Sequence, residues 1–156
     1  MATINAYKMD GLGNDFIIID RRSNPINLTK DKIIELGKRS NIGFDQIIFI
    51  EKEKENSFPI TIFNSDGGEV SACGNGTRCV AFLIFKEKDK KVVDLFVGSN
   101  QLKSKILENS EVETIIGIPK THWKDIPMSE NLDTKNLGIE ISDKNNSSIK
   151  GGIAVN

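Results

Sequence analysis

The sequence is poor in the residues that several kinds of protein site require. It has one histidine, His122, and two cysteines, Cys73 and Cys79. Two cysteines do not make a disulfide framework, and with one histidine they do not supply the ligands of a structural zinc site. A Ser-His-Asp or Cys-His catalytic group would have to use His122, which lies in a polar stretch far from any candidate nucleophile in the sequence. We therefore expect His122 to be a surface or packing residue.

The chain also lacks a surplus of charge and a long apolar segment. Lys and Arg number 21 against 22 Asp and Glu, so there is no basic excess to neutralise nucleic-acid phosphates. The longest apolar run, Cys79 to Phe85, has seven residues, far below the roughly 20 that span a bilayer. The first residues show no basic stretch leading into an apolar one, as a signal peptide would. These features predict a cytoplasmic protein that binds neither nucleic acid nor membrane.

Alternating and amphipathic patterns predict many short strands and two helices. Thr29 is expected to cap a helix that reaches Arg39, and a second helix is expected from Gly74 to about Lys88. After Pro119 the periodicity weakens and polar residues dominate. Strands are expected at residues 5–9, 16–20, 46–51, 59–64, 91–97, 101–107 and 112–118, with a further β-like stretch at 149–155.

The second helix carries the features that indicate chemistry. Every position from Cys79 to Phe85 is apolar, so this helix should be buried on all sides. Unpaired N–H groups at its start, in Cys73-Gly-Asn-Gly76, would attract a carboxylate or phosphate, and glycines let a ligand approach. A helix N-terminus also favours the reactive thiolate form of a cysteine. Cys73 is thus a candidate base or nucleophile, although a small buried residue is the alternative.

We interpret two residues that follow Cys73, Cys79 and Arg78, as structural rather than catalytic. Cys79 lies inside the apolar run, so we assign it to the core. Arg78 stands at the charged start of that run. It could contact a substrate, but we expect it to form a salt bridge with Asp66 or Glu69.

Three sequence blocks resemble those of the diaminopimelate epimerases. Asn64-x-Asp-Gly-x-Glu69, followed by Cys73-Gly-Asn-Gly-Thr-Arg-Cys79, is similar to the family's signature. Met9-Asp-Gly-Leu-Gly-Asn-Asp-Phe16 resembles its opening motif, and Arg39-x3-Gly43-x-Asp-Gln46 resembles a third block. The related proline racemases and phenazine-type isomerases match these blocks less well.

The resemblance implies a cofactor-independent isomerase that interconverts L,L- and meso-diaminopimelate, on the route to lysine and peptidoglycan. In this family one cysteine thiolate removes the Cα proton and a second cysteine delivers a proton to the opposite face. Cys73 matches one of these cysteines, and the family's substrate contacts fall on Asn14, Gln46, Asn64, Gly74 and Asn75. The implied fold is α+β, with a curved mixed β-sheet wrapped around a central buried helix.

The family is nearly twice as long as this chain and has two similar domains, the second of which carries the partner cysteine. We expect residues 1–118 to form the N-terminal domain and residues 119–156 to begin a second, incomplete one. The chain alone, as a fragment or the product of a split gene, would then be inactive. The alternatives are a non-catalytic remnant or binding module of the same fold and a proline-racemase-like isomerase. Its partners would be the small-molecule substrate and the missing domain, and a homodimer stays open.

Overall fold

The computed structural model describes residues 4–142 and 148–156, and the chain divides into two units, Met1–Ile116 and Gly117–Asn156. The first unit contains β1 (Ala6–Gly11), β2 (Asn14–Asp20), α1 (Lys30–Gly37), β3 (Gln46–Ile50), β4 (Phe58–Asn64), β5 (Glu69–Val70), α2 (Gly74–Lys88), β6 (Val92–Val97), β7 (Asn100–Ile106) and β8 (Val112–Ile115). The second contains the short 3₁₀ helix η1 (Trp123–Asp125), β9 (Ile139–Ser142) and β10 (Ser148–Gly151).

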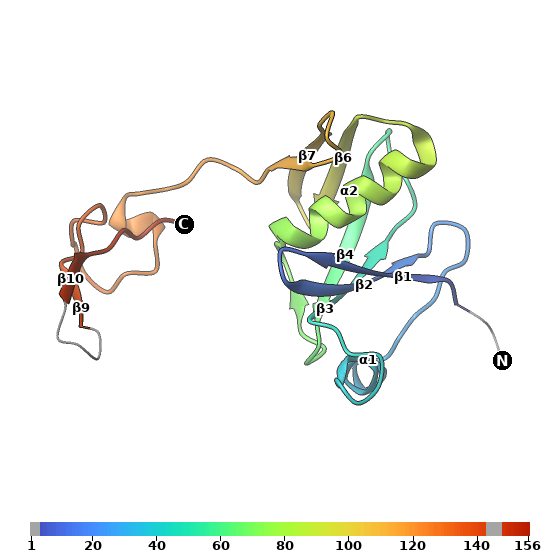
Figure 1. Cartoon of the computed structure of the whole chain (residues 1–156), viewed down its shortest axis with the longest axis horizontal. Coiled ribbons are helices and arrows are strands. Elements are labelled where there is room, and N and C mark those ends of the chain that lie inside the picture. Colours follow the sequence, from blue (N-terminus) through green and yellow to red (C-terminus); the bar gives the residue numbers. More distant parts are fainter. Residues whose placement is uncertain (1–3, 143–147) are drawn as a thin grey trace. The chain divides into compact units, whose positions relative to one another are not determined.

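The first unit is one mixed sheet in the order β1-β2-β3-β4-β6-β7-β8, with β5 paired to β4. β2 runs parallel to β3 and β4 runs parallel to β6, while the other neighbours are antiparallel. Helix α2 contacts β1 and β2 near one edge and β6, β7 and β8 near the other, so the sheet curves around it (Figure 1). This confirms the predicted α+β fold with a curved sheet around a central helix.

Two hydrophobic cores lie on opposite faces of the central strands. Alternate residues of β2, Phe16 and Ile18, pack in the core that holds α2, while Ile17 and Ile19 pack in a second core with Ile33 of α1. The strand β3 divides its residues in the same way. Because these strands are covered on both faces, they are apolar at successive positions rather than at alternate ones.

The second predicted helix has the expected limits but is less completely buried than its sequence suggested. Its core-facing residues include Val80, Ala81 and Ile84, which are fully buried. Phe82, Leu83 and Phe85 are only half-buried, because the sheet stays open between its edge strands β1 and β8 and leaves one side of α2 less covered.

Local signals set the start of α1 and the limits of α2 as predicted, but α1 ends at Gly37 and not at the expected Arg39. The Thr29 side chain accepts a hydrogen bond from the Lys32 N–H at 3.3 Å and caps α1. Asp89, in the left-handed conformation at φ 52°, ends α2. The expected strand at 112–118 is shorter than predicted: β8 ends at Ile115, and Ile116 and Ile118 are exposed. The two-residue strand β5 was not predicted, since two residues carry no periodicity.

In the second unit β9 pairs with β10 in antiparallel register. The sequence analysis missed β9, whose four residues are all exposed and alternate weakly. His122 is exposed, as expected, and its Nδ1 accepts a hydrogen bond from the Lys124 N–H at 3.3 Å. Among the helices of the described residues, none is long and apolar enough to cross a membrane.

Candidate active site

Cys73 is the N-cap residue of α2. Its Sγ accepts a hydrogen bond from the Gly76 N–H at 3.3 Å, and its side chain is half-buried. The first N–H groups of a helix have no partner within the helix and bear partial positive charge. The thiol therefore lies beside N–H groups of the kind that bind a carboxylate or phosphate at a helix N-terminus.

The helix start lies directly on the sheet. A Cβ on Gly76 would come within 2.6 Å of Ile48 Cδ1 and 3.3 Å of Phe16 Cε1, and one on Gly11 would come within 3.2 Å of the Asn75 carbonyl. Glycine at these positions lets the first turn of α2 pack tightly against β1, β2 and β3. A Cβ on Gly74, in contrast, would make only ordinary contacts at 3.7 Å or more.

Two of the predicted site residues meet above this helix start. Asn75 Nδ2 donates a hydrogen bond to Asn14 Oδ1 at 2.6 Å, although the residues are 61 positions apart in the sequence. Asn75 Oδ1 in turn accepts from the guanidinium of Arg78, one turn further along α2. The expected salt bridge of Arg78 with Asp66 or Glu69 is therefore wrong. Arg78 follows Asn75 by three residues on α2, so its guanidinium reaches the Asn75 side chain in the first turn of the same helix.

The other two amides meet on the neighbouring strands. Gln46 begins β3 and Asn64 ends β4, directly opposite each other in register, and Gln46 Nε2 donates to Asn64 Oδ1 at 2.9 Å. Since β2 and β3 are parallel, Asn14 and Gln46 begin strands at the same end of the sheet. The predicted site residues therefore gather at the end of the sheet that receives the N-terminus of α2.

A charged cluster that the sequence analysis missed joins these strand ends. The Asp45 carboxylate accepts from the Asp15 N–H at 2.9 Å, and the Asp45 N–H donates to the Asp15 carbonyl at 2.9 Å. Arg39 bonds both carboxylates at 2.5 Å. The Asp15 N–H, a hydrogen bond from the Asn14 side chain and the Arg39 charge together hold the pKa of Asp45 below its usual 3.8. The only sequence signal for this role was the position of Asp15 beside Asn14 and of Asp45 beside Gln46.

Cys79 belongs to the core, as predicted. It is 6% exposed, and its Sγ lies 3.8 Å from the Asp10 carbonyl. Burial raises the pKa of this thiol from 9.0 to about 11. It is thus held as a thiol at neutral pH, unlike a proton-abstracting base.

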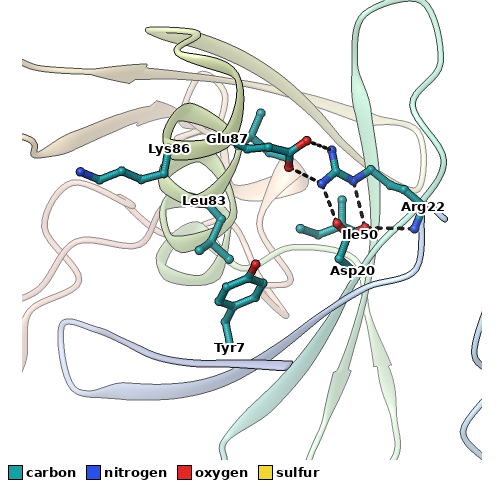
Figure 2. A pocket seen from close by; sticks show the side chains of 8 residues that line it. Tyr7, Asp20, Arg22, Ile50, Leu83, Lys86 and Glu87 are labelled. Carbon is teal, nitrogen blue, oxygen red and sulfur yellow. Dashed lines mark hydrogen bonds and ion pairs between the residues drawn. The ribbon is translucent and has the colours of Figure 1, made fainter. Parts of the chain in front are cut away.

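Two cavities flank α2. One, of about 400 Å³, occupies the opening between the sheet edges and is lined by residues from β1, α2 and the start of β8, among them Asn75, Arg78 and Phe82. The other, of about 330 Å³, lies near the C-terminal end of α2. There Arg22 forms ion pairs with the carboxylates of both Asp20 and Glu87, and the side chain of Tyr7 points toward Leu83 (Figure 2). Leu83 is about 15 Å along the helix axis from Cys73. This second cavity is therefore too far from the Cys73 thiol to belong to the same site.

Solved structures share this fold. A predicted epimerase of Pseudomonas aeruginosa superposes with a TM-score of 0.58 at 17% identity, covering 76% of this chain and 44% of that one. A phenazine biosynthesis protein of Bacillus anthracis superposes with a TM-score of 0.55 at 21% identity, covering 77% of this chain and 42% of that one. At these identities the likeness concerns the fold alone.

The sequence comparisons identify the family. The model described as diaminopimelate epimerase matches residues 6–121. The diaminopimelate epimerase of Pelagibacter ubique is 58% identical over 153 residues, which are 98% of this chain and 56% of that protein. That of Acidiphilium cryptum is 37% identical over 135 residues, 86% of this chain and 49% of that protein. The chain belongs to the diaminopimelate epimerase family, and it spans about half the length of the curated relatives it matches.

Proposed function

We propose that this chain supplies one half of the active site of a diaminopimelate epimerase, with Cys73 as one of two proton-transferring thiols. The observation that carries the proposal is the position of Cys73 as the N-cap of α2, beside the contact between Asn14 and Asn75. The family's substrate carries an α-carboxylate and an α-ammonium group. Amide side chains suit such a zwitterion, because each can donate to the carboxylate and accept from the ammonium.

In the proposed mechanism the α-carboxylate binds the N–H groups at the start of α2, which includes Gly74 and Asn75. The Cys73 thiolate removes the Cα proton, and the electron pair is delocalised into the carboxylate. Fixed N–H dipoles aimed at that carboxylate stabilise the developing charge. A second acid then returns a proton to Cα from the opposite face. No electrons are gained or lost, so the route needs only an acid and a base.

The second acid is proposed to come from outside these 156 residues. Cys79 is the only other cysteine, and it is buried on the same helix as Cys73, so it cannot face the opposite side of a substrate. We propose that residues 1–118 are the N-terminal domain and that residues 119–156 belong to a second domain that carries the other thiol. The same proposal places the protein in the cytoplasm, where thiols remain reduced.

Deuterium incorporation at Cα of L,L-diaminopimelate in D₂O tests this proposal. We expect little inversion by the purified chain, because general acid–base assistance is worth about 10²–10⁴-fold and half of it is absent. Activity should appear when the part of the Pelagibacter ubique relative that this chain does not cover is added as a separate chain. Cys73→Ala should abolish that activity, whereas Cys79→Ala, the matched control, should retain it.

Two outcomes would contradict the proposal. Inversion by the chain alone that depends on Cys73 would mean that a second catalytic group lies within these residues. Binding of diaminopimelate without inversion, even in the complemented protein, would favour a binding module that keeps the fold and the amides.

A further inference from the structure

Asn14 and Asn75 are joined by hydrogen bonds that run in one direction. Arg78 donates to Asn75 Oδ1, and Asn75 Nδ2 donates to Asn14 Oδ1 at 2.6 Å. The Asp45 carboxylate lies near Asn14, because it accepts a hydrogen bond from the N–H of the adjacent Asp15 at 2.9 Å, and the Asn14 side chain helps to hold the pKa of Asp45 below its usual value. The hydrogen bonds thus run from the Arg78 guanidinium through Asn75 to Asn14, with a cation at one end and an anion near the other.

The donor-only guanidinium of Arg78 sets the direction in which the hydrogen bonds between Asn75 and Asn14 run. A guanidinium has five N–H donors and no acceptor, whereas an ionised carboxylate only accepts. If Asn75 turned over, its NH₂ group would face the Arg78 donors. If Asn14 turned over, its NH₂ group would face the NH₂ group of Asn75, which donates to Asn14 Oδ1. Each reversal places like groups in contact, so the charge of Arg78 selects a single orientation for both amides.

The orientation matters for a bound ligand because an isolated asparagine can present either of its ends. With Oδ1 of Asn75 directed at Arg78 and Oδ1 of Asn14 directed at Asn75, each amide keeps one N–H free of this chain of bonds. Those two N–H groups add to the donors at the N-terminus of α2. The site is then held ready to accept a carboxylate before one arrives, which lowers the entropy cost of binding.

We propose that Arg78 is a positioning residue, which acts through Asn75 to fix the orientation of the Asn14 side-chain amide toward the substrate. Arg78 itself need not touch the substrate. Asp45, held in place by Arg39 and by the Asp15 backbone, lies near the Asn14 end of these bonds. The benefit to diaminopimelate binding rests on the proposed function, whereas the orientation of the amides does not.

The side-chain NH₂ signals of Asn14 and Asn75 in ¹H–¹⁵N NMR spectra of the 156-residue chain test this proposal without an activity assay. Arg78→Met should move both pairs of signals, and Arg78→Lys, which keeps a donor-only cation, should largely restore them. Lys88→Met removes a positive charge from the same helix, where Lys88 pairs with Glu53. It is the matched control and should move neither pair.

A second pair of variants separates positioning from a general effect of the charge. If Arg78 acts through Asn75, then Arg78→Met should leave the Asn14 signals unchanged when it is combined with Asn75→Ala. A shift of the Asn14 signals that persists in that background would overturn the proposal. Should the Arg78 variants fail to fold, Asn75→Ala tests the bond through which Arg78 would act, because it removes the donor to Asn14 Oδ1. It should move the Asn14 signals, and their failure to move would equally overturn the proposal.

Titration with L,L-diaminopimelate distinguishes this inference from the proposed function. Diaminopimelate should shift the Asn14 and Asn75 signals, and Arg78→Met should lower the affinity obtained from these shifts about tenfold or more; this result would support both the positioning role and the proposed function. If the highest ligand concentration leaves the spectrum unchanged, while the amide signals still depend on Arg78, diaminopimelate is rejected as the ligand and the positioning role of Arg78 is retained.

Discussion

Cys73 and Cys79 lie on one helix, six residues apart, in opposite chemical settings. The Cys73 sulfur accepts the Gly76 N–H at the end of α2, while the Cys79 sulfur is buried 3.8 Å from the Asp10 carbonyl. Cys73 is half-buried at the helix end, whereas burial raises the pKa of the Cys79 thiol to about 11. One helix therefore separates an accessible thiol from one that serves as packing.

The first prediction concerns the reactivity of these thiols. Limited iodoacetamide labelling at pH 8 under native conditions should modify Cys73 before Cys79, because only about one in a thousand Cys79 thiols is ionised when the pKa is about 11. Peptide mass spectrometry measures the ratio. Urea should abolish the difference, and preferential labelling of Cys79 in the folded protein would contradict the assignment.

The second prediction concerns two glycines of the first turn of α2. Gly76→Ala should lower the free energy of unfolding by about 1–2 kcal/mol, since overpacking against the buried Ile48 exceeds the gain in helix propensity. Gly74→Ala, which meets only ordinary contacts, should change it by about 0.5 kcal/mol or less. Urea denaturation measures both. Equal stability of the two variants would mean that the first turn does not press on the sheet as described.

The third prediction concerns stability in acid. The hydrogen bond from Arg22 lowers the pKa of Asp20, and the Asp15 N–H lowers that of Asp45. In the unfolded chain both should titrate near about 3.9. Their contribution is therefore complete above about pH 4 and is lost as the pH falls through the folded values.

Asp20→Asn tests this directly. The difference in urea midpoint between wild type and variant should be largest near neutral pH and shrink below about pH 4. Gln101→Ala, at an exposed position on β7, removes no titrating group, so it serves as the control and should give no such trend. A difference for Asp20→Asn that grows as the pH falls would show that the sign is wrong.

The fourth prediction concerns the turn between β1 and β2. Leu12 has φ 55° and is 86% exposed, and Gly13 follows at φ 85°. A two-residue turn with positive φ at both positions suits Asn or Gly, whereas leucine is strained there. Leu12→Asn should therefore raise the free energy of unfolding by about 1 kcal/mol.

Leu12→Val provides the opposite test at the same position. A β-branched side chain is disfavoured at positive φ, so this variant should be less stable than the wild type. If the backbone at Leu12 is strained, thermal denaturation should give the highest melting temperature for Leu12→Asn, a lower one for the wild type and the lowest for Leu12→Val. A lower melting temperature for Leu12→Asn would indicate that the exposed leucine makes a stabilising contact instead.

Local chemistry explains the part of the structure that could be predicted from the sequence. Thr29 could be recognised as a cap and the limits of α2 could be placed, because capping bonds and helix periodicity join residues three or four positions apart. The position of Cys73 at the start of α2 followed from the same local pattern, and so did the core position of Cys79. The limits of β8 were misjudged because alternation alone does not reveal where a partner strand ends.

Short-range patterns in the sequence were enough to place the start of α1, the limits of α2, most strands, the buried Cys79 and the family to which the chain belongs. Only the tertiary structure decided that Asn14 meets Asn75 and that the ion pair of Arg39 and Asp45 lies beside Asn14. Sixty-one residues separate Asn14 from Asn75, and no local rule joins them. Their contact depends on how α2 settles on the curved sheet, which is set by the packing of the whole core rather than by any short stretch of the chain.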